Sequence, residues 1–409
     1  MDTITQITDR VLESTVTAPA TVIKAPPGAG KSYLAALIAG MHTAGLGHSI
    51  AIATPTREQG MDLARNITAA YPDVTTVWHA PRPALGLDHA KSPKDLPAGP
   101  HVAVGTLAKW AFYTPDTHEG AYDLLLIDEA WQVTDATLAT VAHVAARYVL
   151  IGDPGQIAPV VTADMSEWAD QPDAPTLPAP EVLAHRHPST PFFELPSTRR
   201  FGPRTAALVS QAFYDFDWDS IAPATTITGT GIPALDEGAE IAASVLPTDP
   251  GVGRADPGVA AHIASLAQQI HQHAHITRDG TPEPVGTIYV VAAHIDQVAA
   301  VRAATAGMDV VVDTAERLQG RQANVVIAWH PASGSTPIGA FQRDTGRLCV
   351  MLSRHKAACI VVMREDTLDR LGAYESTGRA VTGADADYLA WRSTRDVTSW
   401  LHSTAHRTN

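Results

Sequence analysis

Short apolar runs alternate with longer stretches of helical periodicity along the first part of the chain. Buried strands are expected at 21–24, 50–54, 74–78, 101–104, 124–127 and 148–151. Each run ends in turn residues or at the start of a helical stretch, which is typical of βαβ units around a parallel sheet. The pattern therefore predicts an α/β fold with a parallel sheet for this half.

The second half repeats the pattern more loosely. Strands are expected at 287–292, 309–312, 324–329 and 358–362, and helices at 203–213, 258–272 and 294–306. Residues 222–256 carry many Gly, Pro, Thr and Asp residues and are expected to form an irregular surface excursion. A second α/β lobe follows from this reading.

A stretch rich in Pro and Asp separates the two halves. Residues 170–190 show no clear periodicity, so we place the linker between the lobes there. The first lobe with its linker is expected at 1–190, the second lobe at 191–375 and a C-terminal helical tail at 376–409. Tyr388, Trp391 and Trp400 favour a tail helix packed on a lobe over an element that binds a partner.

Composition narrows the class of protein. The 409 residues carry a net charge of −14, which argues against coating nucleic acid through bulk electrostatics, so any such contact must be local. No apolar run is long enough to span a membrane, and the N-terminus lacks the pattern of a signal peptide, so we expect a cytoplasmic protein without membrane contact. Cys349 and Cys359 are too few for a disulfide framework or a four-cysteine zinc site.

A glycine-rich loop follows the first expected strand and precedes a helical stretch, which is the setting of a Walker A phosphate loop. The residues predicted to bind the nucleotide here are Pro27, Gly28, Ala29, Gly30, Lys31 and Ser32. Lys31 is expected to neutralise the β- and γ-phosphates, and the Ser32 hydroxyl to ligate Mg²⁺. Ala25 stands where a glycine is usual, but the phosphate-wrapping positions remain. A glycine-rich turn without function is the alternative.

An apolar strand at 124–127 ends in two carboxylates. Asp128 is expected to hold Mg²⁺, and Glu129 to orient and deprotonate the attacking water. The alternative is a helix N-terminal cap, which the upstream phosphate loop makes less favoured. Trp131, directly after this pair, is expected to be buried or at a lobe interface in preference to stacking on a base.

Another apolar strand ends in the sequence Gly-Asp-Pro-Gly-Gln at 152–156. Gln156 has the length and the amide group to touch a γ-phosphate or its attacking water, and so to report hydrolysis. A Pro-Gly turn with an incidental glutamine is the alternative.

The order of these motifs resembles that of the superfamily 1 helicases. Residues 53–56, Ala-Thr-Pro-Thr, look like motif Ia of that family, and residues 104–106, Val-Gly-Thr, look like the motif that follows it. In relatives both motifs bind the sugar-phosphate backbone. The resemblance therefore implies nucleic-acid contacts by Thr54, Pro55, Thr56, Gly105 and Thr106.

The resemblance continues into the second lobe. Residues 195–202 look like motif IV, where an arginine before Phe reaches the γ-phosphate; Arg200 fits best and Arg199 is its rival. Residues 347–356 look like motif VI and imply that Arg354 is an arginine finger. Their ending, Ser-Arg-His-Lys, is most similar to that of the compact helicases of plus-strand RNA viruses.

Four further positions rest on the resemblance. Residues 313–322 look like motif V, whose Gln319 and Gly320 are assigned to nucleotide binding, although Gln322 stands where an acidic residue is usual. Gln6 is implied to read adenine, and His294 stands where an aromatic residue meets the strand in relatives. The motifs span 6–363 with short gaps, which implies two RecA-like parallel-sheet lobes, a P-loop NTPase tandem without large accessory domains.

The resemblance implies a nucleic-acid-dependent ATPase that uses ATP and Mg²⁺. It indicates a helicase or translocase moving 5′-to-3′ on single-stranded DNA or RNA. A nucleotide-switched binding module is the alternative from another class, and a motor subunit that relies on a nuclease or replication partner is the alternative within the class. A small-molecule P-loop kinase fails to explain the arginines of the second lobe.

Two weaker signals remain. His271, His273 and His275 lie two residues apart without a cysteine or carboxylate cluster, which favours a solvated helix end over a metal site. The loop around Lys91 and Lys94 is expected to lie over a strand of nucleic acid, because of its charge and position.

Overall fold

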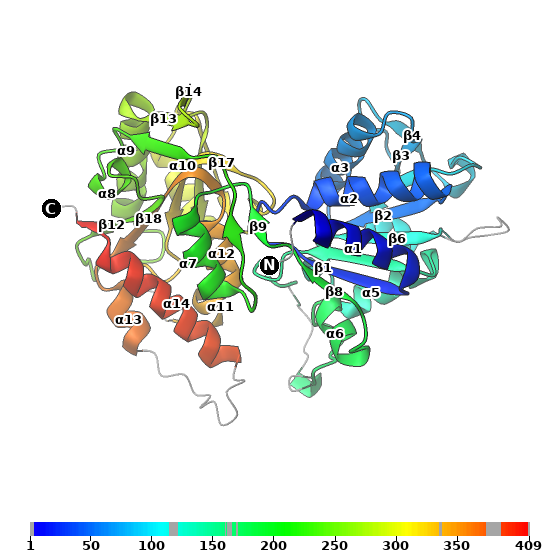
Figure 1. The fold of residues 1–409 in the computed structure, drawn as a ribbon. Coiled ribbons are helices and arrows are strands. Elements are labelled where there is room, and N and C mark those ends of the chain that lie inside the picture. Colours follow the sequence, from blue (N-terminus) through cyan, green and yellow to red (C-terminus); the bar gives the residue numbers. More distant parts are fainter. Residues whose placement is uncertain are drawn as a thin grey trace. The chain divides into compact units, whose positions relative to one another are not determined.

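The structure is a computed structural model that describes residues 4–113, 122–159, 161, 166–168, 171–334, 338–373 and 386–407. The chain divides into two compact units (Figure 1). Unit 1 contains Met1–Pro154 and Ala158–Pro196, and unit 2 contains Gly155–Ile157 and Ser197–Asn409. The chain therefore passes briefly into unit 2 at residues 155–157 before it leaves unit 1 finally.

Unit 1 is built on eight parallel strands in the order β4-β3-β5-β2-β6-β7-β1-β8. Their bounds are β1 (Ala20–Lys24), β2 (Ile50–Thr54), β3 (Thr76–His79), β4 (Asp88–Ala90), β5 (Val102–Thr106), β6 (Leu124–Asp128), β7 (Tyr148–Gly152) and β8 (Phe192–Glu194). The strands expected in this half are present within two residues of the predicted starts and ends. The edge strands β4 and β8 were not predicted, because each is short and partly exposed.

Consecutive residues of these strands point to opposite faces of the sheet, so each strand serves two cores. Val22 joins one core and Ile23 joins the other. Helices α1 (Ile4–Thr17), α2 (Lys31–Gly40) and α3 (Arg57–Ala70) cover the face of Ile23, and α4 (Leu107–Ala111), α5 (Asp135–Val141) and α6 (Ala179–Arg186) cover the other. Both faces are therefore buried, as continuous apolar strands require.

Unit 2 has a sheet of six parallel strands in the order β16-β15-β17-β18-β12-β19. Their bounds are β12 (Ile241–Leu246), β15 (Ile288–Ala292), β16 (Val310–Thr314), β17 (Ala323–Trp329), β18 (His355–Arg364) and β19 (His406–Arg407). Smaller pieces are the pair β9 (Ser197–Thr198) and β10 (Asp219–Ser220), and the antiparallel sheet of β11 (Thr225–Thr228), β13 (His275–Arg278) and β14 (Thr281–Glu283). The predicted α/β fold with two parallel-sheet lobes is confirmed.

Helices also cover both faces of the second sheet. One core unites the sheet with α7 (Pro203–Phe213), α12 (Thr345–Leu352) and α14 (Ala386–Ser403), and the other unites it with α8 (Pro233–Asp236), α9 (Pro257–His273) and α10 (Ile295–Ala304). Two short helices, α11 (Ala340–Arg343) and α13 (Thr367–Ala373), pack against α14. The helices predicted at 203–213, 258–272 and 294–306 correspond to α7, α9 and α10.

The expectation of an irregular surface excursion at 222–256 is wrong. This segment contains β11, α8 and β12, and every residue of β12 is buried between β18 and β19. Two alanines and a serine weaken the apolar run of β12, and its flanks are rich in turn residues, so the strand did not stand out in the sequence. The predicted linker at 170–190 likewise contains α6, whose Ala179 and Val182 are buried, and unit 1 continues to Pro196 because β8 pairs with β1.

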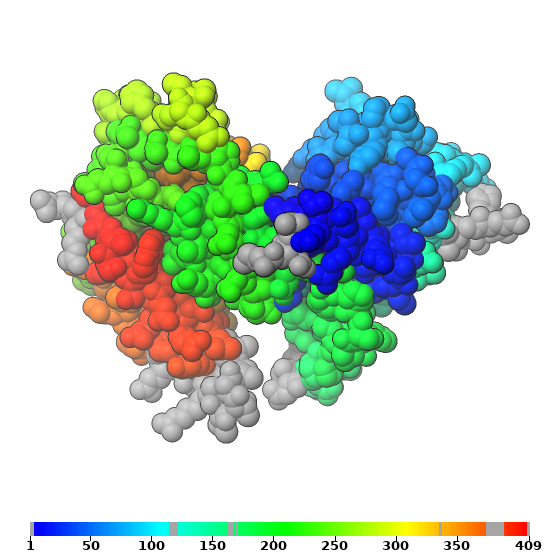
Figure 2. Space-filling model, viewed as in Figure 1, coloured from blue at the N-terminus to red at the C-terminus, as the bar shows by residue number. Residues whose placement is uncertain are grey.

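The C-terminal segment is folded onto unit 2 where it is described. Helix α14, red in Figure 2, lies on the surface of this unit, with Val397 and Leu401 in its core. The Trp391 indole donates a hydrogen bond to the Leu371 carbonyl at 2.8 Å. A helix packed on a lobe, as expected from the tail residues, is therefore present, and β19 extends the sheet beyond it. Among the described residues no helix is both long and apolar enough to cross a membrane.

Candidate nucleotide and strand sites

The predicted phosphate loop joins β1 to α2. Gly28 and Gly30 have φ values of 79° and 93°, a region that glycine adopts without strain. Gly30 is the N-cap residue of α2, so the helix begins at Lys31 with its N-terminal N–H groups facing the loop. Strand, left-handed glycines and helix N-terminus together form the arrangement that binds phosphate in P-loop proteins.

Three charged residues meet beside this loop. The Lys31 ammonium lies 3.6 Å from the Glu129 carboxylate, and both side chains are largely buried. Asp128 ends β6, and its carboxylate accepts a hydrogen bond from the Glu129 backbone N–H at 3.0 Å. The residues predicted from separate motifs as phosphate ligand, metal ligand and base are therefore brought together.

The backbone at Glu129 is unusual. Its φ is 54°, in the left-handed region that residues other than glycine rarely adopt. Such a conformation costs free energy and persists only where the surrounding structure holds it. The carboxylate is aimed at Lys31 from this bend, a feature that no periodicity in the sequence indicated.

Burial, and after it the neighbouring Glu129 carboxylate, raise the pKa of Asp128 to about 7, while Lys31 acts in the opposite direction. A buried carboxyl of this kind is favoured as an anion when a cation is beside it. Mg²⁺ is bound in proteins through one or two carboxylates, with waters and phosphates completing its shell. Asp128 and the Ser32 hydroxyl fit that donor set.

Close packing fixes the acidic pair against β7. A Cβ added to Gly152 would meet the Ala130 nitrogen at 2.8 Å and the Trp131 ring at 2.9 Å. Trp131 is 5% exposed and belongs to a core of unit 1. This burial favours the packing interpretation of Trp131 over base stacking.

The predicted strand-binding residues of unit 1 lie at the carboxyl ends of neighbouring strands. Thr54 of β2 is in register with Thr106 of β5. Thr56 and Thr106 are the N-cap residues of α3 and α4, and their side chains accept hydrogen bonds from the Gln59 and Lys109 backbone N–H groups. Both segments therefore start helices at the same edge of the sheet.

The atoms available at this edge differ between residues. The Thr54 side chain is fully buried, and its hydroxyl donates to the Thr56 carbonyl at 2.9 Å, whereas Thr56 is exposed and Pro55 is half-buried. A Cβ at Gly105 would lie 2.9 Å from the His79 carbonyl oxygen, so only glycine fits there. Thr56, Pro55 and Thr106 therefore offer the accessible surface.

Unit 2 holds its predicted arginines in defined positions. The Arg200 guanidinium donates to the Ser353 carbonyl at 2.8 Å and to the Gln322 side chain at 3.1 Å, whereas Arg199 is exposed. Arg354 is 1% exposed, and its Nη2 donates to the Ser353 hydroxyl at 2.9 Å. Gln322, which departs from the acidic residue of relatives, therefore orients Arg200.

Gln156 packs with unit 2 although it follows β7 in sequence. Its side-chain oxygen accepts a hydrogen bond from the Gln319 amide at 2.7 Å. A Cβ at Gly346 would lie 2.6 Å from the Gln156 carbonyl oxygen, and Ile157 belongs to a core of unit 2. Gln156 and Gln319, both predicted to act on the nucleotide, are thus hydrogen-bond partners. Gly320 follows Gln319 and has a φ of 79°.

His294 is the N-cap residue of α10, and its ring stacks on Phe341 with centroids 4.4 Å apart. The Arg347 guanidinium lies 3.6 Å from the centre of the same phenyl ring. Burial, and then Arg254, lower the pKa of His294. Phe341 was not predicted, since α11 has only four residues and carries no motif.

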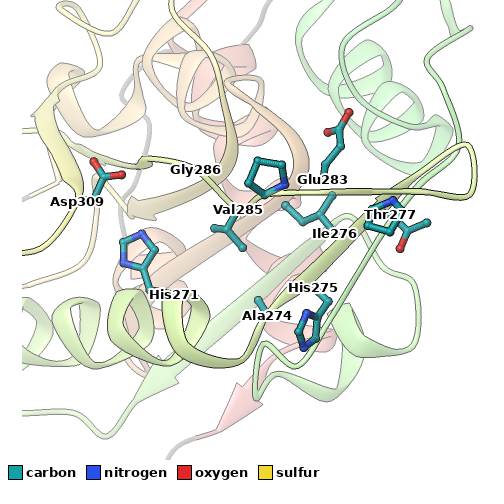
Figure 3. A pocket seen from close by; sticks show the side chains of 11 residues that line it. His271, Ala274, His275, Ile276, Thr277, Glu283, Val285, Gly286 and Asp309 are labelled. Carbon is teal, nitrogen blue, oxygen red and sulfur yellow. The ribbon is translucent and has the colours of Figure 1, made fainter.

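Two features lie apart from these motifs. Gln6 is exposed on α1, a helix tied to the π-helical turn Met41–Gly45 after α2 by the hydrogen bond between Thr15 and His42 at 2.8 Å. A hollow of about 580 Å³ in unit 2 is lined by residues at the end of α9 and along β14, including His271, His275 and Asp309 (Figure 3). Because Asp309 precedes β16, this hollow lies at the amino ends of the strands, opposite the motif residues.

His271, His273 and His275 lie close together in sequence at the end of α9 and the start of β13. Within the described ranges, no group of three or more His, Cys, Asp and Glu residues is placed to hold a metal ion. His271 and His273 lie at the exposed end of α9, and His275 begins β13. All three side chains are exposed, and only His271 and His273 belong to the end of a helix.

Two different sequence models of the AAA domain match the chain, at residues 6–179 and 257–366. The first match falls in unit 1 and the second in unit 2. Each model covers less than half of the chain, and together the matches indicate an AAA domain in each unit. The order of the motifs along the two matched regions resembles that of the superfamily 1 helicases, as predicted.

Solved helicase structures are similar to the chain at low identity. Arterivirus nonstructural protein 10 (helicase) is 15% identical with a TM-score of 0.46, over 87% of this chain and 61% of that protein. The PRRSV helicase is 15% identical with a TM-score of 0.45, over 87% and 54%. The Escherichia coli DEAH/RHA helicase HrpB is 14% identical with a TM-score of 0.48, over 88% and 42%. No curated protein matches the sequence.

Proposed function

We propose that the protein hydrolyses ATP and uses the energy to move along a single strand of nucleic acid. The observation that carries the proposal is the buried meeting of Lys31, Asp128 and Glu129 beside a glycine loop and a helix N-terminus. A phosphoryl-transfer site explains the whole set.

Nucleotide binding follows from the loop. The backbone N–H groups of residues 28–30 and the α2 N-terminus surround the phosphates, and Lys31 leaves Glu129 for the β- and γ-phosphates. Bound Mg²⁺ supplies positive charge to the phosphate oxygens. Asp128 and Ser32 would hold that ion, and Gln6 on α1 would contact the base.

Hydrolysis then needs a base and positive charge at the γ-phosphate. Glu129, released from Lys31, accepts a proton from the attacking water, and the left-handed bend at this residue keeps its carboxylate aimed. Arg200 and Arg354 neutralise charge that develops as the γ-phosphoryl group departs. Gln156 and Gln319, joined by their side chains, sense that departure together, with Gly320 beside them.

The strand contacts are assigned to both units. In unit 1 they are Thr54, Pro55, Thr56, Gly105 and Thr106, with backbone groups replacing the buried Thr54 hydroxyl. In unit 2 the contact is His294, whose stacked ring is fixed by Phe341. The resemblance of the motifs to those of superfamily 1 helicases supports movement along single-stranded DNA or RNA in the 5′-to-3′ direction.

The proposal is tested by ATPase assays of the full chain with single-stranded DNA, single-stranded RNA and no polymer. We expect strong acceleration by at least one polymer, because strand binding completes the catalytic arrangement of a motor. ATPase rates that neither polymer changes would contradict the proposal of a motor and favour a nucleotide-switched binding module. A motor subunit of a larger assembly, with a nuclease or replication partner, would accelerate on single strands yet leave duplexes intact.

A further inference from the structure

Lysine is rare in this chain and unevenly placed. The lysines are Lys24, Lys31, Lys91, Lys94, Lys109 and Lys356. Half of them fall between residues 91 and 109, around β5 of unit 1, although the net charge of the chain is −14. Such a cluster in an acidic protein marks a local site for anions.

The three lysines are held on a rigid frame. The Lys109 ammonium donates to the Lys91 carbonyl at 2.8 Å, which ties α4 to the segment after β4. That segment turns through a capping box in which the Ser92 N–H and hydroxyl both donate to Asp95 at 2.8 Å. Lys91 and Lys94 are exposed, and neither forms an ion pair with a described residue.

An exposed phenyl ring follows Lys109 by three residues at the end of α4. Phe112, the C-cap residue of α4, is 85% exposed, whereas its neighbours Trp110 and Tyr113 are 0% and 6% exposed. The Trp110 indole donates to the Ile52 carbonyl at 2.8 Å and anchors α4 on β2. The exposure of Phe112 therefore belongs to a fixed helix and is not the result of a loose segment.

Helix α4 also carries one of the proposed strand contacts. Thr106 is its N-cap residue and Phe112 its C-cap residue. A helical rise of about 1.5 Å per residue places the two ends roughly 9 Å apart. The Lys109 amine, the Thr106 hydroxyl and the exposed Phe112 ring thus lie along one short helix that begins at the carboxyl end of β5, and the segment of Lys91 is tied to this helix.

We infer that α4 and residues 91–95 form a strand-binding strip, in which Lys91, Lys94 and Lys109 contact phosphates and Phe112 stacks on a base. The inference rests on the proposed function, since it places the strand that the motor would follow. Stacking on an aromatic ring tolerates any base, which suits a protein that moves along a strand. Amines and backbone groups provide the phosphate contacts at fixed positions.

Fluorescence anisotropy with labelled oligodeoxythymidine and oligouridine tests the ring. Phe112→Ala should weaken binding of the full chain by about 5- to 150-fold, the range for loss of one stacked base. Phe112→Trp should restore it. The matched control is Leu85→Ala, which removes an aliphatic side chain that is 94% exposed in the same unit and should leave affinity unchanged.

An abasic series distinguishes stacking from a general surface effect. Moving one abasic site along the oligodeoxythymidine should weaken wild-type binding at one position, and Phe112→Ala should be insensitive there because ring and base act together. Lys91→Gln with Lys94→Gln should reduce the salt slope of log affinity by about 1.4, at roughly 0.7 per phosphate contact on single strands. Thermal unfolding of each variant should match wild type, since all three side chains are exposed.

Two failures are distinguishable. If wild-type protein bound neither oligonucleotide and its ATPase ignored both polymers, the proposed function would fail and the strip with it. If wild-type protein bound and was accelerated while Phe112→Ala bound equally well, only the strip would be overturned. Equal sensitivity of Phe112→Ala and wild type to every abasic position would also contradict stacking.

Discussion

The two units share one architecture and differ in how they hold their charged motif residues. In unit 1, Lys31 and Glu129 form an ion pair of 3.6 Å, and Asp128 is buried beside them with a pKa raised to about 7 by burial and the Glu129 carboxylate. In unit 2, Arg200 is bound to a carbonyl and an amide, and Arg347 is bound to Glu316 at 2.7 Å. The charged motif residues of unit 1 therefore contact one another, whereas the arginines of unit 2 are held by other residues of that unit.

This difference indicates what each unit is expected to contribute to ATP binding and hydrolysis. A long ion pair and a carboxyl with a raised pKa gain stability when phosphate and a cation arrive, so unit 1 is the part that should respond to nucleotide. Arginines fixed by hydrogen bonds are oriented before the reaction and lose little freedom during it. Unit 2 is therefore expected to supply charge to the transition state more than affinity for the ground state.

The largest effect is expected at the phosphate loop. Lys31→Ala should abolish measurable turnover, because the phosphate charge loses its main counter-charge. The fold should survive, since Lys31 contributes little to the core. Steady-state ATPase and thermal unfolding check this, and substantial residual turnover would show that the phosphates bind elsewhere.

The next effect concerns the base in the same unit. Glu129→Gln should bind ATP yet hydrolyse it about 10²-fold or more slowly, the usual scale for a positioned general base. Binding of a fluorescent ATP analogue and single-turnover hydrolysis separate the two steps. Near-normal hydrolysis would mean that another group takes the proton.

The neighbouring residues Arg199 and Arg200 test the role expected for unit 2. Arg200→Ala should lower turnover about 10²-fold or more with little change in ATP affinity, because its charge acts mainly on the departing phosphoryl group. Arg199→Ala is the matched control, since Arg199 is exposed and should be nearly neutral. If Arg199→Ala were the more damaging change, the two assignments would be exchanged.

The smallest effect on chemistry is expected at Arg347, seven residues before Arg354 in sequence. Its side chain is 6% exposed and pairs with Glu316 and Asp344, which are about a third exposed. Arg347→Ala should lower the free energy of unfolding by about 1–3 kcal/mol while turnover per folded molecule stays close to wild type. Urea unfolding checks this against Arg302→Ala, a more exposed pair expected to cost well under 1 kcal/mol. Lost turnover without lost stability would make Arg347 a catalytic residue.

Contiguous motifs account for what the sequence could predict. The phosphate loop and the Asp128-Glu129 pair lie directly after apolar strands, so their meeting at one sheet edge followed from parallel topology alone. Strand β12 could not be predicted because two alanines and a serine weaken its apolar run and turn residues flank it. Helix α6 was missed in a stretch whose prolines and acidic residues are typical of linkers.

Tertiary contacts account for what the sequence could not predict. No local pattern shows that Gln156 pairs with Gln319, or that Gln322 orients Arg200, since these partners lie far apart along the chain. The left-handed backbone at Glu129 depends on packing around β6 and β7. Phe112 lies between two buried aromatic residues, so its exposure became visible only when α4 was placed on the sheet.

A motor must couple the binding of nucleotide to the binding of the nucleic-acid strand. The affinity for a single strand in different nucleotide states measures this coupling. Anisotropy of a labelled single strand is measured with wild-type protein in the presence of ADP, a non-hydrolysable ATP analogue and no nucleotide. A motor whose unit 1 responds to ATP should change strand affinity by about 5- to 150-fold between states, the usual range of coupling between two sites. Equal affinity for the single strand in all three nucleotide states would contradict the proposal that the protein is a motor.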